Sequence, residues 1–141
     1  MAKPEILFWG DYTRQGFPFY TGNMEYYVDV PAVEQSDDLK KRERILHIPY
    51  FEGAAVKVCV PKEKAQIVAF APQNASLHGK EACRVKLILL GNRYNGFGQL
   101  HLIGNDMVWL GPDSFRSCGD SFTSTYNVIS MGIMSEPVII L

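Results

Sequence analysis

The eight residues from Cys83 to Leu90, CRVKLILL, have the pattern of a strand in the middle of a sheet. The segment begins with apolar and charged residues in alternation, which is the period of a β-strand with one buried face. It ends with apolar residues at consecutive positions, so both faces of the strand are expected to be covered there. A strand of this kind predicts a protein organised around a β-sheet.

Short segments of similar character precede this strand. Asn23 to Val30 and Arg44 to Ile48 are each followed by a proline, which cannot donate to a sheet ladder and therefore ends the strand. Ala54 to Val60 places valines at alternate positions. The polar turn at 61–64 then joins it to Ala65 to Phe70, so these two segments are a predicted hairpin.

Two more strands are predicted near the end of the chain, Ser121 to Ser130 and Pro137 to Leu141, with a turn around Gly132 between them. Val33 to Arg44 has charge pairs at helical spacing but no apolar stripe, so a helix and a solvated loop remain alternatives. Segments of this length and spacing predict an all-β fold, an antiparallel β-sandwich. A length of 141 residues fits one domain, residues 1–141.

Charge and composition exclude several classes of function. A formal net charge of -1 leaves no positive excess for a nucleic acid or an anionic membrane. No apolar run approaches the roughly 20 residues that span a bilayer, and the first eight residues lack the features of a secretory signal peptide. The three cysteines form neither a complete disulfide framework nor a Cys-x-x-Cys pair. We therefore expect neither nucleic acid nor membrane as a partner.

Common catalytic motifs are missing from the sequence. It contains no nucleophile elbow and no phosphate-binding loop, and Gly96-Phe97-Gly98 lacks the third glycine of a dinucleotide fingerprint. A small stand-alone glycosidase would need two carboxyl groups around one sugar bond. The candidates are Asp11, Glu25, Asp106, Asp113 and Asp120, and no motif pairs them. We expect no catalytic residue and no cofactor, with a structural calcium ion held by loop oxygens as the alternative.

Residues 91–119 are the most informative segment. They hold six of the twelve glycines, interspersed with Asn, Asp and Pro, which is turn chemistry sustained over roughly thirty residues. A long segment of this kind in a compact domain is a binding or docking surface, or a packed loop. Of the seventeen aromatic residues, eight precede Val28 and six lie between Tyr94 and Tyr126. If these two regions meet, they form an aromatic end of the sandwich.

Aromatic rings and planar polar side chains are the groups that bind sugars, because rings stack on C–H faces and amides, guanidinium and imidazole groups bind hydroxyls. The candidate carbohydrate-binding or docking residues are Trp9, Tyr12, Gln15, Tyr20, Asn92, Arg93, Asn95, His101, Trp109 and Arg116. For Trp109 and Tyr12, a place in the core is an equal alternative. Core positions are expected for Phe17, Phe19, Phe97 and Phe122.

Four segments resemble one known family. Gln15 to Gly22 (QGFPFYTG), Leu90 to His101 (LGNRYNGFGQLH), Trp109 to Phe115 (WLGPDSF) and Gly132 to Leu141 occur in the order found in the C-terminal β-sandwich of bacterial α-L-rhamnosidase-like glycoside hydrolases and their unclassified relatives. The loop from Gly91 to His101 is the most specific of these matches. Two departures are Gln99, where the family often has proline, and the PKEK turn at 61–64, where it usually has Asn-Gly.

The resemblance implies a galactose-binding-domain-like jelly roll and a role as a C-terminal accessory domain of a larger glycoside hydrolase. In that family the catalytic carboxylates lie in a separate barrel domain, so none is transferred to this chain. The expected function is a non-catalytic carbohydrate-binding or domain-docking module, with carbohydrate or the parent's catalytic domain as partner. The alternatives are a purely structural domain packed on the barrel and a small stand-alone glycosidase. Burial of the loop's Asn and Arg side chains would favour docking.

Overall fold

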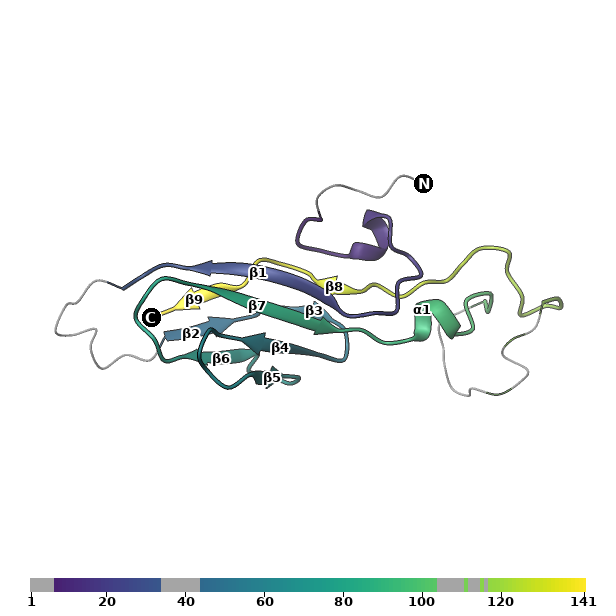
Figure 1. The fold of residues 1–141 in the computed structure, drawn as a ribbon. Helices are drawn as coiled ribbons and strands as arrows, with labels where there is room; N and C mark the ends of the chain where they lie inside the picture. Colours follow the sequence, from purple (N-terminus) through teal and green to yellow (C-terminus); the bar gives the residue numbers. More distant parts are fainter. Residues whose placement is uncertain (1–6, 34–43, 104–110, 112–114, 116) are drawn as a thin grey trace.

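In the computed structural model, which describes residues 7–33, 44–103, 111, 115 and 117–141, the chain is built from short antiparallel strands with very little helix (Figure 1). The elements are η1 (Tyr12–Gln15), β1 (Met24–Val30), β2 (Arg44–His47), β3 (Phe51–Glu52), β4 (Ala55–Cys59), β5 (Gln66–Val68), β6 (Asn74–Leu77), β7 (Cys83–Leu90), α1 (Tyr94–Phe97), β8 (Gly132–Ile133) and β9 (Val138–Ile140). The predicted all-β sandwich is confirmed.

Strand β7 lies inside the largest sheet, whose order is β1-β7-β4-β5. On one side it pairs with β1 along its whole length, from Met24 opposite Leu89 to Val30 opposite Cys83. On the other side it pairs with β4, and β4 continues into β5 through the turn at 61–64. Both the central strand and the hairpin were correctly predicted. In the turn, Lys62 takes a φ of 64°, the left-handed conformation that Asn or Gly usually supplies.

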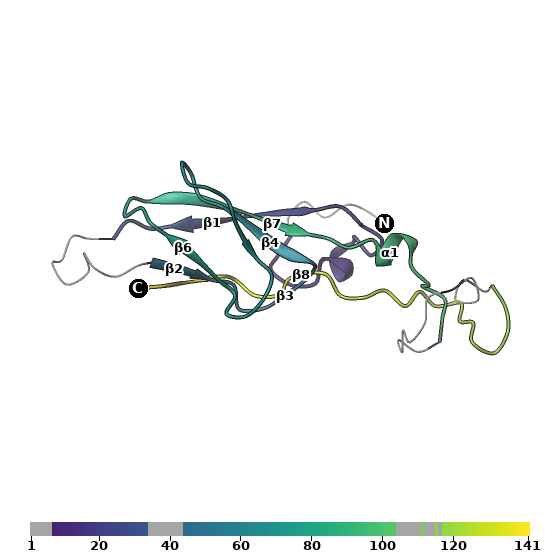
Figure 2. The same cartoon turned by 90° about the horizontal axis from the view of Figure 1, so that it is seen from below.

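The second layer consists of the sheet β6-β2-β9 and the small pair β3-β8. Figure 2 shows this layer facing the β1-β7-β4 layer. Alternate residues of each strand point between the layers, so that valines and leucines of β7 and β4 meet apolar residues of β2, β6 and β8 in one core. The fully buried side chains of this core include Leu46, Ile48, Val56, Val58, Val85, Leu87, Leu89, Met131 and Ile133.

Two predictions about secondary structure are wrong. Residues 121–130 do not form a strand: Phe122 makes one isolated bridge with Leu102, and the rest is irregular. Gly132 lies in β8 rather than in a turn. In addition, strands β3 and β6 were not predicted. The segment in which a helix was considered, Val33 to Arg44, lies for the most part outside the described residues.

Candidate functional site

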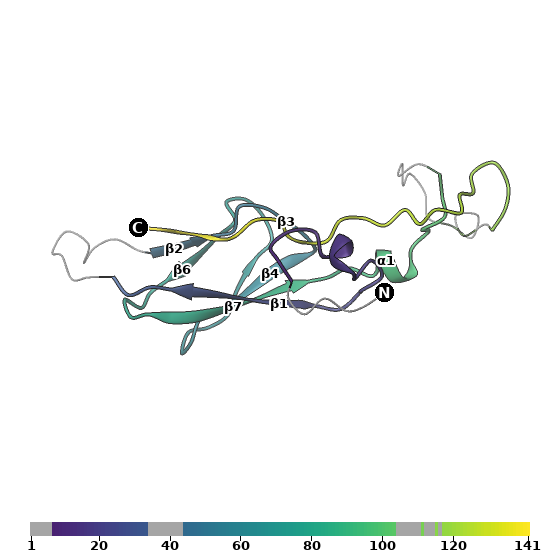
Figure 3. The ribbon, with the colours of Figure 1, turned by 90° about the horizontal axis from the view of Figure 1, so that it is seen from above.

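Three segments distant in sequence meet at one end of the sandwich, away from the C-terminus (Figure 3). They are the N-terminal segment with η1, the segment with α1 and the segment that leads into β8. The N-terminal segment runs along β8, where Gly10 N donates to Ile133 O at 2.8 Å and Tyr12 N donates to Met131 O at 2.9 Å. Gly132, with a φ of 149°, must be glycine here, because a Cβ atom would overlap the carbonyl oxygen of Gly10.

The aromatic rings of the two regions also meet at this end. The rings of Phe19 and Tyr126 lie edge to face at 5.0 Å, and the ring of His101 lies 4.5 Å from that of Tyr126. The N-terminal and the later aromatic regions, whose meeting the sequence left open, are therefore in contact here.

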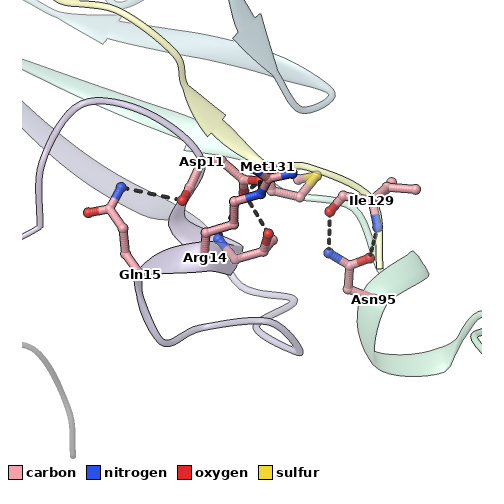
Figure 4. A network of polar contacts seen from close by, with 7 residues as sticks. Asp11, Arg14, Gln15, Asn95, Ile129 and Met131 are labelled. Atoms are coloured by element: carbon pink, nitrogen blue, oxygen red, sulfur yellow. Dashed lines mark hydrogen bonds and ion pairs between the residues drawn. The ribbon is translucent and has the colours of Figure 1, made fainter. Parts of the chain in front are cut away.

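Asp11 bonds the N-terminal segment to Met131, which directly precedes β8. Its Oδ1 accepts hydrogen bonds from the backbone N–H of Thr13 at 2.9 Å, from the Thr13 hydroxyl at 2.6 Å and from Met131 N at 3.2 Å (Figure 4). Burial by itself raises the pKa of this carboxyl, but the hydrogen bonds from Thr13, Met131 and Ser130 outweigh burial and hold the pKa below its ordinary value of 3.8. Asp11 is therefore a structural carboxylate that caps η1 and accepts a hydrogen bond from the backbone of Met131.

Asn95 bonds the glycine-rich loop to Ile129, two residues before Met131. Its side chain is 1% exposed. Its Nδ2 donates to Ile129 O at 2.8 Å, and its Oδ1 accepts from Ile129 N at 2.8 Å (Figure 4). The amide therefore replaces a missing sheet partner for Ile129 and has no free polar atom for a ligand.

Other predicted polar residues also bond to the chain itself. Gln15 accepts from Phe8 N at 2.8 Å and donates to Phe8 O at 3.1 Å. Asn92 Oδ1 accepts from Tyr94 N at 2.9 Å, and His101 Nδ1 lies 2.9 Å from Thr123 O. These side chains therefore bond to backbone groups of the loops.

The remaining predicted residues divide between core and surface. Tyr12 is 1% exposed and belongs to the core, where burial first, and then Tyr26, Tyr20 and Asp11, raise its pKa to about 12. Its ring is not available to a ligand.

Tyr20 and Arg93 are exposed, and the Tyr20 hydroxyl donates to Asn23 O at 2.8 Å. Trp9 stacks on Tyr26 with 5.2 Å between ring centres and 11° between ring planes. Trp109 and Arg116 lie outside the described residues.

Two phenylalanines expected in the core lie on the surface instead. Phe19 is 47% exposed and Phe97 73% exposed, and the nearby Tyr126 is 55% exposed. Gly96 places α1 directly against the backbone of Phe19 and the side chain of Thr21. The rings of Phe19 and Tyr126 are in contact, and Phe97 follows Gly96 in the chain; we call these three exposed residues the loop-end patch. The glycines on both sides of Phe97 were a signal for its exposure, because a single helical turn between glycines cannot cover a ring.

Phe17 packs partly buried against the core, as expected, and Phe122 is half-buried. Among the carboxyl candidates, Glu25 pairs with Lys86 at 3.3 Å, Asp120 is exposed, and Asp106 and Asp113 lie outside the described residues.

The described residues contain no group of three or more His, Cys, Asp or Glu side chains able to hold a metal ion. Within the same residues, no helix has the length and apolar character to cross a membrane. Comparisons with protein families, with curated proteins and with solved structures find no match to this chain.

Proposed function

We propose that this chain is a non-catalytic β-sandwich module of a multidomain glycoside hydrolase, and that it docks on the parent's catalytic domain through the loop-end patch. The jelly-roll topology and the C-terminal position in the parent chain are parts of this proposal, which come from the family resemblance. The observation that carries the docking role is that the amide of Asn95 bonds to the chain itself, whereas the three rings of the loop-end patch are exposed.

Direct sugar binding at this end would require polar groups that are free to bind hydroxyls. Asn95 and Asn92 already bond to backbone groups, and freeing them would leave part-buried partners unsatisfied at a cost of about 1 kcal/mol or more each. Docking requires no such exchange. Exposed aromatic rings contribute strongly to protein interfaces, because each loses a large apolar area to the partner.

The test uses this chain and the catalytic domain of its parent as separate proteins, with affinity measured by isothermal titration calorimetry. The triple variant Phe19→Ser, Phe97→Ser, Tyr126→Ser should weaken binding at least about 100-fold, as expected for removal of interface aromatics. Phe70→Ser is the matched control, because Phe70 is 86% exposed but lies beyond β5, outside the patch. Circular dichroism checks folding. Wild-type affinity in the folded triple variant would refute docking through this patch.

A second candidate function, carbohydrate binding, is favoured by a hollow beside β1. Phe8, Trp9, Tyr26 and Tyr27 line it together with Glu25, and its volume is about 360 Å³. The carboxylate of Glu25 accepts a hydrogen bond from the Tyr27 hydroxyl at 3.0 Å. Aromatic rings beside a carboxylate are a combination that suits a sugar.

Titration with a panel of methyl glycosides, including the α-L-rhamnoside, tests this second candidate. Saturable quenching of tryptophan fluorescence that is lost in Trp9→Ala would support it. If no glycoside gives binding heat in isothermal titration calorimetry or quenches the fluorescence, carbohydrate binding at this hollow is excluded. The docking proposal does not depend on this result.

A further inference from the structure

A second hollow lies at the opposite end of the sandwich, where β7 begins. Its volume is about 730 Å³, a size typical of small-molecule sites. It is lined by the first residue of β2, by the turn between β4 and β5, and by the turn between β6 and β7. None of these residues takes part in the loop-end patch, so this hollow is independent of the proposed docking function.

The side chain of Arg44 is the unusual feature of this hollow. Arg44 points toward the core at the start of β2 and is only 5% exposed. Its Nη1 donates to Pro31 O at 2.8 Å, and its Nη2 donates to the carbonyl oxygens of Gly79 and Glu81. Its Nε has no acceptor within the part of the chain that the structure describes.

Among the described residues, no carboxylate is paired with Arg44. All three of its acceptors are neutral carbonyl groups. A buried cation without a counter-charge is unfavourable, because neutral dipoles replace only part of its hydration. An anion in the adjoining hollow would add negative charge beside Arg44.

The other lining residues narrow the chemistry of this anion. Lys62 and Lys80 add positive charge at the lining, whereas the guanidinium of Arg84 is already held by Asp29, with Nε and Oδ1 2.7 Å apart. Glu63 and Glu81 also line the hollow and would repel a highly charged ligand, so a single acid group fits best. The remaining wall is apolar and consists of Val60, Pro61, Leu77, Ala82 and Cys83.

We propose that this hollow binds a small organic anion, with one acid group facing Arg44 and the two lysines and an apolar part packed on the wall of Val60, Leu77 and Ala82. The acid group supplies the counter-charge, and the apolar part removes that wall from water. Both a carboxylate and a phosphate could supply the negative charge. Only an organic acid also carries an apolar part that can pack on the wall, so this part distinguishes it from inorganic phosphate.

The test follows the Nε–H signal of Arg44 by NMR in the full chain of 141 residues, with the signal assigned through Arg44→Lys. The probes are phenylacetate, its neutral analogue phenylacetamide, and inorganic phosphate. Phenylacetate should shift the Arg44 signal and the backbone signals of Ala82 and Cys83 in a saturable manner. Phenylacetamide should bind at least about tenfold more weakly, because it lacks the charge, and phosphate should also bind more weakly, because it lacks the apolar part.

Variants at the lining keep the proposal testable even if Arg44→Lys fails to fold. Lys62→Gln and Lys80→Gln should each weaken phenylacetate binding about two- to fivefold, the usual effect of a partly exposed charge. Lys57→Gln is the control, because Lys57 lies on β4 and does not line the hollow; its affinity should match the wild type.

Three results would overturn the proposal. The first is the absence of a saturable shift up to about 10 mM phenylacetate. The second is equal binding of phenylacetate and phenylacetamide. The third is a shift of the Arg44 signal without any ligand when Glu34, Asp37, Asp38 and Glu43 are replaced by their amides, since the chain itself would then supply the counter-charge.

Discussion

Replacing Asn95 by alanine should destabilise the protein by about 2–3 kcal/mol. The Asn95 amide is 1% exposed and forms two hydrogen bonds of 2.8 Å with the same residue, Ile129. The alanine variant leaves both the N–H and the C=O of Ile129 without these partners. An unsatisfied buried group costs about 1–3 kcal/mol. Ile129 is itself half-buried, so water reaches part of this site, and each of the two groups is expected to cost about 1–1.5 kcal/mol, near the low end of this range.

Urea unfolding of the purified chain measures this loss. With a slope of about 2–3 kcal/mol per molar urea for a chain of this size, the midpoint should fall by about 1 M without a change in slope. Asn23→Ala is the matched control: Asn23 is exposed, and its Oδ1 accepts a longer hydrogen bond of 3.3 Å from Gly91 N. The control should remain within about 0.5 kcal/mol of the wild type.

Asn95→Asp separates the hydrogen bonds from simple packing. A protonated carboxyl can donate to Ile129 O and accept from Ile129 N, as the amide does, whereas a carboxylate can only accept and would face the carbonyl oxygen of Ile129. The aspartate variant should therefore approach wild-type stability in acid and lose stability relative to the wild type as the pH rises. Asn95→Ala within about 0.5 kcal/mol of the wild type, or an aspartate variant without this pH dependence, would refute the reasoning.

Three further variants test the same end of the sandwich. Gly132→Ala should cost more than about 2 kcal/mol in urea unfolding, because its φ is 149° and the added Cβ would overlap Gly10 O, whereas Gly79→Ala, with nothing near the added atom, should change little. Asp11→Asn should be less stable than the wild type at neutral pH, and the difference should shrink as the pH falls below 3.8: a lowered pKa gives stability that is present above the unfolded-state value and is lost as the native carboxylate becomes protonated. Tyr12→Phe should stay within about 0.5 kcal/mol at neutral pH, because the buried hydroxyl has no partner among the described residues. Since the raised pKa of Tyr12, about 12, gives stability that is lost as the pH rises toward that value, the phenylalanine variant should resist alkaline unfolding better.

The predictable part of the fold depends on local patterns. Strands β1, β4 and β7 carry apolar residues at alternate positions, and a proline follows β1 directly, so their bounds could be predicted from neighbouring residues alone. Strand β6 could not. Its sequence, NASL, alternates polar and apolar residues over only four positions, too few for a reliable pattern. Part of its pairing comes from a side chain: Gln66 donates to Ser76 O at 2.8 Å and accepts from Ser76 N at 2.9 Å. A contact of this kind has no local signal.

The strand predicted at residues 121–130 does not form, for a related reason. Their threonine, tyrosine, valine and isoleucine residues have high β propensity, but their backbone partners are scattered. Asn127 N donates to Leu100 O at 2.7 Å, Thr123 N donates to His101 O at 2.8 Å, and Ile129 is held by the amide of Asn95. Propensity describes what a segment tolerates, and the available partners decide whether a ladder forms.

The sequence raised the meeting of the two aromatic regions only as a condition, because positions in the chain do not tell which loops meet. The roles expected for amides and rings were partly exchanged: Asn95 is buried and Phe97 is exposed. The same chemistry explains the error. A long loop must satisfy its own N–H and C=O groups, and Asn, Gln and Asp side chains do so with the same atoms that would bind sugar hydroxyls. Composition therefore cannot separate a self-bonded loop from a sugar-binding one.

The backbone that carries the loop-end patch is held by side-chain hydrogen bonds. Because Asp11 and Asn95 fasten the N-terminal segment and α1 to residues 129–131, the rings of the loop-end patch are carried by backbone that is held in place before a partner arrives. A partner that covers such a patch gains apolar contact without having to order the loop first, which is the advantage of a preorganised surface. At the other end, Arg44 is held by neutral carbonyls, and none of the described carboxylates is paired with it. The two proposals therefore assign different ligands to the two ends: an apolar protein surface at the loop-end patch, and an acid group in the hollow beside Arg44.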